Sequence, residues 1–299
     1  MAVGRVGMSP TLTVPTTSMQ SKMADVEANL KRAKEVMTKA ARLGAEIVVF
    51  PETYLQGYTC GEVDYNFFKL AEPIPGPATD VLVKHAKKHN IYVAMGLAEA
   101  NQEYAGTIHN SSVFLGPEGI LHVHRKVHLA ELPPCLKEVH YGYAPGDDFS
   151  VFKIRQNWKV GMAICRDMSF PESARVMAIK GMDLLITMSA GPYFTKERWN
   201  MVNPVRAMDN DVFHVYSNVV GTQLGDVNFW GGAMIISPTG DFLAKGKVDE
   251  EDLIVAELKV EDLLECRKTH CYMRDRRPTA YQEICSTKYL PGSAWGKEK

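Results

Sequence analysis

Three reactive side chains each stand at the end of an apolar run. Glu52 follows "IVVFP", Lys126 follows "ILHVHR" and Cys165 follows "VGMAI". Apolar runs of this length predict buried strands, and α/β proteins build their sites at the carboxyl ends of strands. A cysteine attacks as its thiolate, a carboxylate can take the thiol proton, and a lysine can stabilise an oxyanion. Together these residue types indicate nucleophilic acyl transfer.

Each of the three residues also has a structural interpretation. A cysteine at a strand end is often a small buried hydrophobe. A glutamate after proline can be a helix cap or a surface charge, and a lysine at a strand end can be solvated or salt-bridged. The spacing in the sequence leaves these alternatives open.

Amphipathic helices alternate with apolar strands along the chain. The clearest helix covers 25–43, with Asp25 as its cap and Gly44 at its end. Further helices are predicted near 79–89, from 171 and near 199–209, each before an apolar strand. Hairpins that turn at 117–119 and 238–240 interrupt this alternation. We therefore expect an α/β fold, with mixed sheets covered by helices in a single domain.

The composition excludes several kinds of partner. The chain is 45% hydrophobic and has a net charge of −1, unlike the strongly basic proteins that bind nucleic acid or anionic membranes. No run approaches the roughly 18 apolar residues of a membrane-spanning helix. The first twenty residues lack the apolar core of a signal peptide. We expect a cytoplasmic protein that binds neither nucleic acid nor a membrane.

The cysteines and histidines form no recognisable metal or disulfide pattern. No CxxC pair occurs among the cysteines, which lie at positions 60, 135, 165, 266, 271 and 285. Cys266 and Cys271 flank His270, but this is one weak cluster without a second pair. The histidines at 122, 124 and 128 fit strand alternation around Lys126, without a paired acid. Free thiols, no metal and no cofactor are expected.

The motifs in their order resemble the nitrilase, or carbon–nitrogen hydrolase, superfamily. The resemblance covers nearly the whole chain, through "GAEIVVFPETYLQGY", "HRKVHL", "GMAICRDMSFPESAR", "NPVRAMDND", "WGGAMIISPTG" and "RDRRPTAY". It implies an αββα sandwich over residues 1–290, followed by a mobile tail at 291–299. It also implies a homodimer or a larger homo-oligomer, paired through an outer helical layer.

The same resemblance assigns catalytic roles. It implies a triad of Glu52, Lys126 and Cys165, assisted by a second glutamate between the lysine and the cysteine. Glu138 is the candidate for that glutamate and Glu131 is the alternative. Replacing Glu52 or Lys126 is then expected to slow turnover severely with little change in melting temperature.

The implied activity is hydrolysis of a linear amide or an N-carbamoyl group, with release of ammonia through a cysteine thioester. The alternatives are a nitrilase and a catalytically silent interaction protein. Nitrilases of the superfamily typically have Trp-Glu after the nucleophile, whereas this chain has Arg166-Asp167, which favours the amidase and carbamoyl branches.

The substrate itself is less well defined by the sequence. Met168 and Ser169 stand where related enzymes for N-carbamoyl amino acids carry an arginine, so we expect a substrate without an α-carboxylate. Candidate substrate-binding residues are Tyr54, Tyr58, Arg166, Tyr193, Phe194 and Trp230.

Overall fold

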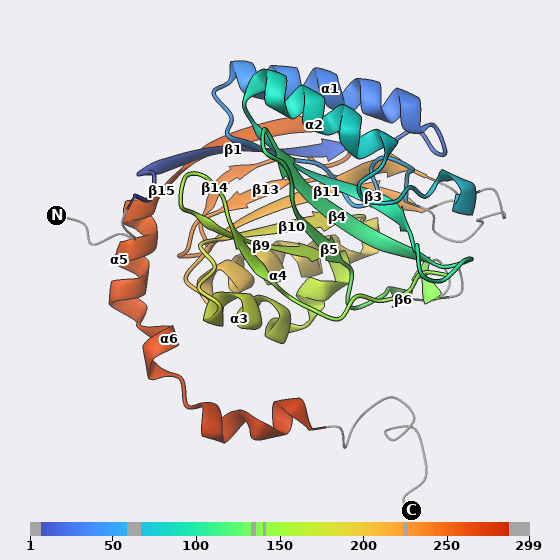
Figure 1. Cartoon of the computed structure of the whole chain (residues 1–299). Coiled ribbons are helices and arrows are strands. Elements are labelled where there is room, and N and C mark those ends of the chain that lie inside the picture. The colour runs from blue at the N-terminus through green and yellow to red at the C-terminus, as the bar shows by residue number, and fades with distance from the viewer. Residues whose placement is uncertain (1–6, 59–66, 133–135, 140–141, 224–226, 287–299) are drawn as a thin grey trace, which may run out of the picture.

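Two layers of strands lie between two layers of helices (Figure 1). The computed structural model of the chain describes residues 7–58, 67–132, 136–139, 142–223 and 227–286. The expected αββα arrangement in a single domain is confirmed. The expected tail at 291–299 lies outside the described residues.

Among the described residues, thirteen strands join into one mixed sheet, and β6 and β7 form a separate two-stranded sheet. The main path of the larger sheet runs β5-β4-β3-β2-β1-β11-β10-β9-β8, with β12, β13, β14 and β15 attached at its sides. The strands from β3 through β2, β1, β11 and β10 to β9 are parallel, and the remaining pairs are antiparallel. The strand bounds are β1 (Thr11–Met19), β2 (Ile47–Val49), β3 (Tyr92–Ala100), β4 (Ile108–Gly116), β5 (Gly119–Arg125), β6 (Glu131–Leu132), β7 (Leu136–Lys137), β8 (Val151–Lys153), β9 (Lys159–Ile164), β10 (Leu184–Ser189), β11 (Phe213–Thr222), β12 (Asn228–Trp230), β13 (Met234–Ile236), β14 (Phe242–Lys245) and β15 (Asp252–Lys259).

The predicted helices are present with small differences at their ends. The side chain of Asp25 accepts from the Ala28 N–H at 3.0 Å, which confirms it as the cap of the first helix. The helix predicted near 79–89 begins at Pro77, and the one predicted near 199–209 begins at Lys196. The helix bounds are α1 (Val26–Arg42), α2 (Pro77–His89), α3 (Pro171–Ile179), α4 (Lys196–Met208), α5 (Val260–His270) and α6 (Tyr272–Asp275), with short 3-10 helices η1 (Phe67–Leu70), η3 (Cys165–Ser169), η4 (Tyr193–Thr195) and η5 (Pro278–Cys285).

The packing of the core explains why these strands are continuous apolar runs in the sequence. Ile47 and Val49 of β2 face the core between the two strand layers, whereas Val48 faces the core under α1 and α2. In the other layer, Ile186 of β10 faces the central core and Leu185 faces the core under α3 and α4. Both faces of these strands are buried, so the sequence does not alternate between apolar and polar residues.

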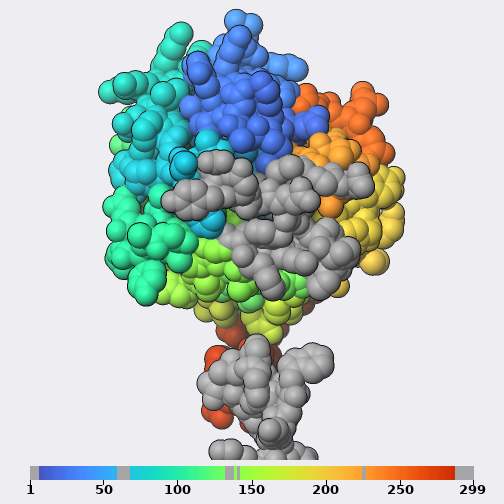
Figure 2. Space-filling model, turned by 90° about the vertical axis from the view of Figure 1, so that its right-hand side faces the viewer, coloured from blue at the N-terminus to red at the C-terminus, as the bar shows by residue number. Residues whose placement is uncertain are grey.

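The elements that were not predicted from the sequence include β1, β15 and α5. Strand β1 contains Pro15, which argues against an interior strand because proline has no N–H to donate. In the fold, β1 nevertheless lies between β2, β11 and β15. Beyond α5, the segment from α6 to η5 extends away from the body of the molecule (Figures 1 and 2).

Candidate active site

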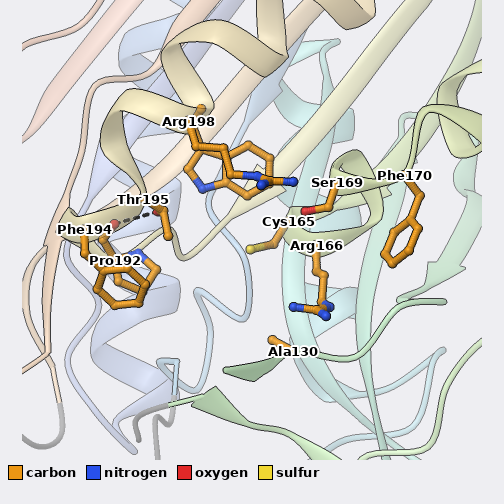
Figure 3. Close-up of a pocket in the computed structure, with 10 residues that line it drawn as sticks. Ala130, Cys165, Arg166, Ser169, Phe170, Pro192, Phe194, Thr195 and Arg198 are labelled. Atoms are coloured by element: carbon orange, nitrogen blue, oxygen red, sulfur yellow. Dashed lines mark hydrogen bonds between the residues drawn. The ribbon is translucent and has the colours of Figure 1, made fainter. Parts of the chain in front are cut away.

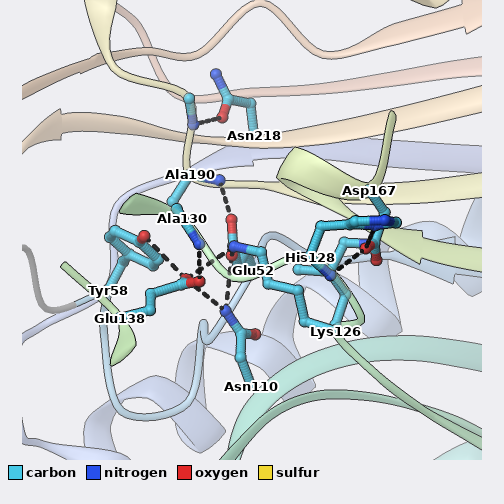
Figure 4. Close-up of polar contacts among 12 residues, drawn as sticks. Glu52, Tyr58, Asn110, Lys126, His128, Ala130, Glu138, Asp167, Ala190 and Asn218 are labelled. Carbon is cyan, nitrogen blue, oxygen red and sulfur yellow. Dashed lines mark hydrogen bonds and ion pairs between the residues drawn. The ribbon is translucent and has the colours of Figure 1, made fainter. Parts of the chain in front are cut away.

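A buried lysine joins two buried carboxylates. The Lys126 side chain is fully buried directly after β5, and its Nζ donates to Oε1 of Glu52 and to Oε1 of Glu138, each at 2.7 Å (Figure 4). Asn110 of β4 donates its Nδ2 to the same two oxygens, at 2.7 Å and 3.1 Å. The structure therefore brings three of the four predicted catalytic side chains into one hydrogen-bonded cluster.

Glu52 is held between two strand ends. Its Oε2 accepts the backbone N–H of Ala190, which follows β10, at 2.6 Å. The turn that carries Glu52 presses against β3 at Gly96, where a Cβ would lie 2.3 Å from the carbonyl oxygen of Pro51. Glycine at position 96 therefore allows the close approach that places Glu52 over the sheet edge.

Glu138, rather than Glu131, reaches the lysine. The Oε2 atom of Glu138 accepts the N–H of Ala130 at 2.6 Å, and its Oε1 accepts the hydroxyl of Tyr58 at 3.0 Å. Only 2% of Glu138 is exposed. The Glu131 side chain instead accepts the backbone N–H of Val139 at 2.7 Å, so it serves the local turn.

Cys165 begins η3 directly after β9. Its φ of 44° lies in the left-handed region, an uncommon conformation for a residue with a side chain and one found at functional turns. Burial raises the pKa of the thiol to about 12, and the charge of Glu52 acts in the same direction, while Lys126 opposes it. These interactions indicate that the thiol lies within the field of the buried cluster.

An aspartate that sequence reasoning did not assign fixes the turn after Cys165. Asp167 is fully buried and accepts from His124 Nε2 at 3.1 Å, from the Ile164 N–H at 3.0 Å, and from both the N–H and Nδ1 of His128 at 2.9 Å and 3.0 Å (Figure 4). The expectation that His124 and His128 lack a paired acid was therefore wrong. The acid is distant in sequence and reaches them through the fold. Despite its burial, these hydrogen bonds hold the pKa of Asp167 below its usual value.

A cavity of about 510 Å³ opens beside the cysteine. Figure 3 shows the Cys165 thiol between the side chains of Arg198 and Arg166. The cavity is lined by Ala130, Cys165, Arg166, Ser169, Phe170, Pro192, Phe194, Thr195, Arg198 and Trp199.

Comparison with known proteins agrees with this geometry. The family model of carbon-nitrogen hydrolases matches residues 6–268. The chain belongs to the carbon–nitrogen hydrolase family. It is 34% identical over 262 residues to an omega-amidase, NIT2-B, of Xenopus laevis, covering 85% of this chain and 91% of the relative. An (R)-stereoselective amidase of Pseudomonas sp. is 32% identical over 255 residues, with 85% and 87% coverage.

A solved structure shows the same fold in this family. The crystal structure of a carbon-nitrogen hydrolase from Helicobacter pylori G27 superposes with a TM-score of 0.85 at 24% sequence identity, covering 93% of this chain and 99% of that one. The resemblance to the carbon–nitrogen hydrolases is confirmed along the chain.

The hydrolase brings only some of the predicted substrate-binding residues to the cavity. Arg166 and Phe194 line it, and Tyr58 contacts the buried Glu52–Lys126–Glu138 cluster through Glu138. Tyr54 is fully buried in the core under α1, with its ring centroid 5.5 Å from that of Phe50.

Two further aromatic candidates do not line the cavity. Trp230 is fully buried and stacks on Tyr216 in the core under α3 and α4. Tyr193 is 41% exposed and packs against the ammonium group of Lys196. An aromatic side chain near a motif is thus as often used for packing as for binding.

The hydrolase cavity carries two arginines, of which the sequence analysis named only Arg166. Arg198 comes from α4, and it lines the cavity together with Arg166. Within the described part of the chain, neither guanidinium forms an ion pair or a hydrogen bond with an acidic side chain. The cavity therefore presents two cations beside the thiol.

Two other residues of the site could have been found by a stricter reading. Asn110 lies in β4 among the polar residues His109, Ser111 and Ser112, and a buried amide requires hydrogen-bond partners. Asp167 is the third residue after the buried strand β9, just as Glu52 is the third residue after β2. What the sequence could not show is which groups they contact.

Proposed function

We propose that the protein hydrolyses the C–N bond of a small linear amide or N-carbamoyl compound and releases ammonia through a thioester on Cys165. The observation that carries this proposal is the buried Glu52–Lys126–Glu138 cluster, whose charges act on the Cys165 thiol. The family and the amidases among the similar proteins support the same reaction.

The first step forms the carbon–sulfur bond. Glu52 takes the proton of the Cys165 thiol, the thiolate attacks the amide carbon, and the C=O π pair moves to oxygen. Burial raises the pKa of Glu52, although the charge of Lys126 opposes this effect. The raised pKa makes the Glu52 carboxylate a stronger base. The oxyanion is stabilised by the Lys126 ammonium and by the backbone N–H of Arg166.

The second step breaks the C–N bond and the third regenerates the thiol. The proton on Glu52 passes to the amide nitrogen, ammonia leaves, and the oxyanion collapses to the thioester. Glu52, aided by Glu138, then takes a proton from water, the hydroxide attacks the thioester carbon, and the cysteine leaves as a thiolate that regains the proton. No metal or organic cofactor takes part in this sequence.

Glu138 supports the charge of the lysine. Burial would lower the pKa of Lys126, but the carboxylates of Glu138 and Glu52 together raise it well above its usual value. The lysine therefore remains an ammonium throughout the reaction, as an oxyanion partner must.

The two arginines favour a substrate with an anionic group. A guanidinium and a carboxylate form a strong charge-assisted pair, and no acid of the described chain occupies either side chain. This replaces the sequence-based expectation of a substrate without an α-carboxylate, which rested on Met168 and Ser169 standing where related enzymes carry an arginine. A relative that is named as an omega-amidase supports an amide as the group that is cleaved.

An ammonia-release screen tests the reaction and the substrate class. Matched compounds would be a terminal amide with a free carboxylate, its methyl ester, the N-carbamoyl analogue and the corresponding nitrile. We expect the carboxylate amide or carbamoyl compound to be hydrolysed fastest. Fastest turnover of the nitrile would make the protein a nitrilase, and no turnover of any compound would favour the catalytically silent alternative.

Replacing Arg198 separates substrate class from chemistry. Arg198→Gln should lower kcat/KM for the carboxylate amide by about 10–100-fold, the loss of one charged hydrogen bond of about 1.5–3 kcal/mol. The methyl ester should be unaffected. An equal loss for both compounds would contradict the anion-binding role and leave the reaction itself intact.

We further propose a cytoplasmic homodimer or larger homo-oligomer. The outer helices carry exposed apolar side chains suited to an interface, namely Val176, Ile179, Met201, Val205 and Met208. Cys165, Cys266, Cys271 and Cys285 are free thiols, as in a reducing compartment. Among the helices described, none combines the length and apolarity needed to cross a bilayer. A stable monomer at micromolar concentration in light scattering would contradict the oligomer.

A further inference from the structure

A second cluster of reactive side chains lies outside the catalytic cavity. Cys266 and His270 are four residues apart on α5 and therefore share one face of that helix. The fold adds Asp211, which follows α4, and none of the three residues lines the cavity beside Cys165. The sequence showed only the weak Cys266–His270–Cys271 pattern, because the aspartate is distant along the chain.

The three ligand atoms already lie close to metal-binding geometry. Cys266 Sγ is 3.3 Å from Asp211 Oδ1 and 3.3 Å from His270 Nδ1, and those two atoms are 2.9 Å apart. Around tetrahedral zinc, with Zn–S near 2.3 Å and Zn–N or Zn–O near 2.0–2.2 Å, ligand atoms lie about 3.3–3.6 Å apart. Each pair would need to open by only a few tenths of an ångström.

We propose that Asp211, Cys266 and His270 bind a divalent transition metal, for which zinc is the best match. One thiolate, one imidazole and one carboxylate are the ligand types that zinc prefers. The metal replaces the thiol proton of Cys266, which passes to solvent. The carbonyl oxygen of Pro238, 3.4 Å from Sγ, or a water molecule supplies the fourth ligand.

The surroundings hold the ligands in place and leave an entry path. Asp211 has a φ of 48° and is almost fully buried. Arg267 of α5 donates to the backbone oxygen of Asp211 at 3.2 Å and to Asp183 at 2.9 Å, so helix and turn are joined independently of a metal. The His270 side chain is 29% exposed, which gives a metal access from solvent.

A metal at this position would fasten α5 to the turn after α4. The α6 to η5 segment continues from α5 away from the body (Figure 1), so the same site would fix the base of that segment. The role is structural, since no ligand belongs to the catalytic cluster.

Cobalt titration of the full chain tests the site. The Cys165→Ala variant would be used, to remove the thiol of the catalytic cavity, and Co²⁺ would be the probe. We expect one equivalent of Co²⁺ to give thiolate-to-cobalt charge-transfer absorption and tetrahedral d–d bands, which Zn²⁺ abolishes. No charge-transfer absorption would overturn the proposal.

Matched variants locate the ligands. Cys266→Ser should remove the charge-transfer absorption, whereas Cys271→Ser should keep it, because the Cys271 thiol donates to the Lys268 carbonyl oxygen at 3.1 Å instead. Should Cys266→Ser fail to fold, His270→Ala at the partly exposed end of α5 provides a second test. It should weaken Co²⁺ and Zn²⁺ binding by at least 10–100-fold, because that much affinity is lost even when a residue that only hydrogen-bonds a metal ligand is replaced. Unchanged affinity in His270→Ala, or absorption that depends on Cys271, would refute the assignment.

Discussion

Replacing Lys126 by methionine removes the one cation between two buried carboxylates. Methionine has a similar length and no charge, so it fills much of the same space. The structure predicts two separate losses: the oxyanion partner, and the neutralisation of Glu52 and Glu138. The sequence alone led us to expect a loss of turnover with little change in stability. The complete burial of the lysine replaces that second expectation.

The size of the stability loss follows from the geometry. Each carboxylate oxygen lies 2.7 Å from Nζ, so the two oxygens are at most about 5.4 Å apart. At an effective dielectric constant of about 20, two unit charges at this separation repel by about 3 kcal/mol. That energy corresponds to about two pKa units, so one carboxyl of the variant should retain its proton near neutral pH.

This reasoning gives the pH dependence a definite sign. A carboxyl whose pKa is higher in the folded than in the unfolded protein contributes stability below the unfolded pKa and loses it as the pH rises through the folded pKa. Burial already raises the pKa of Glu52 in the wild type, and removing the charge of Lys126 in the variant raises this pKa further. The free-energy difference between Lys126→Met and wild type should therefore be larger at about pH 8 than at about pH 5.

Urea unfolding at the two pH values, together with kcat, measures both losses. We expect kcat to fall by about 100–1,000-fold, the usual effect of losing one oxyanion donor. Lys247→Met is the matched control, because Lys247 forms an exposed pair with Glu250 at 2.8 Å and such pairs contribute at most about 1 kcal/mol. A stability loss in Lys126→Met that is equal at both pH values would refute the electrostatic argument.

Three other predictions test the site. Cys165→Ala should abolish turnover without lowering the melting temperature, and mass spectrometry of wild type during turnover should find the acyl group on Cys165 and on no other cysteine. Glu138→Gln should lower kcat far more than Glu131→Gln, and the reverse order would move the second carboxylate to Glu131. Asp167→Asn should cost about 1.5–3 kcal/mol in urea unfolding. Because the fold lowers the pKa of Asp167, the stability that this residue contributes is present above its unfolded pKa and is lost as the pH falls. The difference in the free energy of unfolding between Asp167→Asn and wild type should therefore shrink in acid. A difference that grows in acid would contradict the pairing of Asp167 with His128.

Local sequence patterns were sufficient to predict most of the helices and strands in the layers around the site. The Asp25 cap, the proline at the start of α3 and the two hairpin turns are written within a few residues, and each is present in the fold. Buried strands such as β2 and β10 are recognisable because both faces are apolar. Strand β1 was missed because its central position is set by partners from both ends of the chain, which outweigh the preference of Pro15.

Long-range pairing accounts for what the sequence could not reveal. Glu52 and Lys126 are 74 positions apart, and the contact of Asp167 with His128 spans 39. Their places after apolar runs make Glu52, Lys126 and Asp167 candidates, but the local sequence does not show which groups they contact. The resemblance to a family implied the roles of Glu52, Lys126 and Cys165, but the places of Asn110 and Arg198 follow only from the way the sheet edge and α4 converge on the cavity.

The adjacent cations Arg125 and Lys126 show that a shift of one residue would decide which cation is buried. At the end of β5 they point to opposite sides, since side chains alternate along a strand. Arg125 remains 48% exposed and pairs with Glu99 at 2.6 Å, whereas Lys126 is fully buried against Glu52 and Glu138. A register slip of one residue between β4 and β5 would exchange the two. The hairpin register, more than the residue type, therefore decides which cation serves the buried carboxylates.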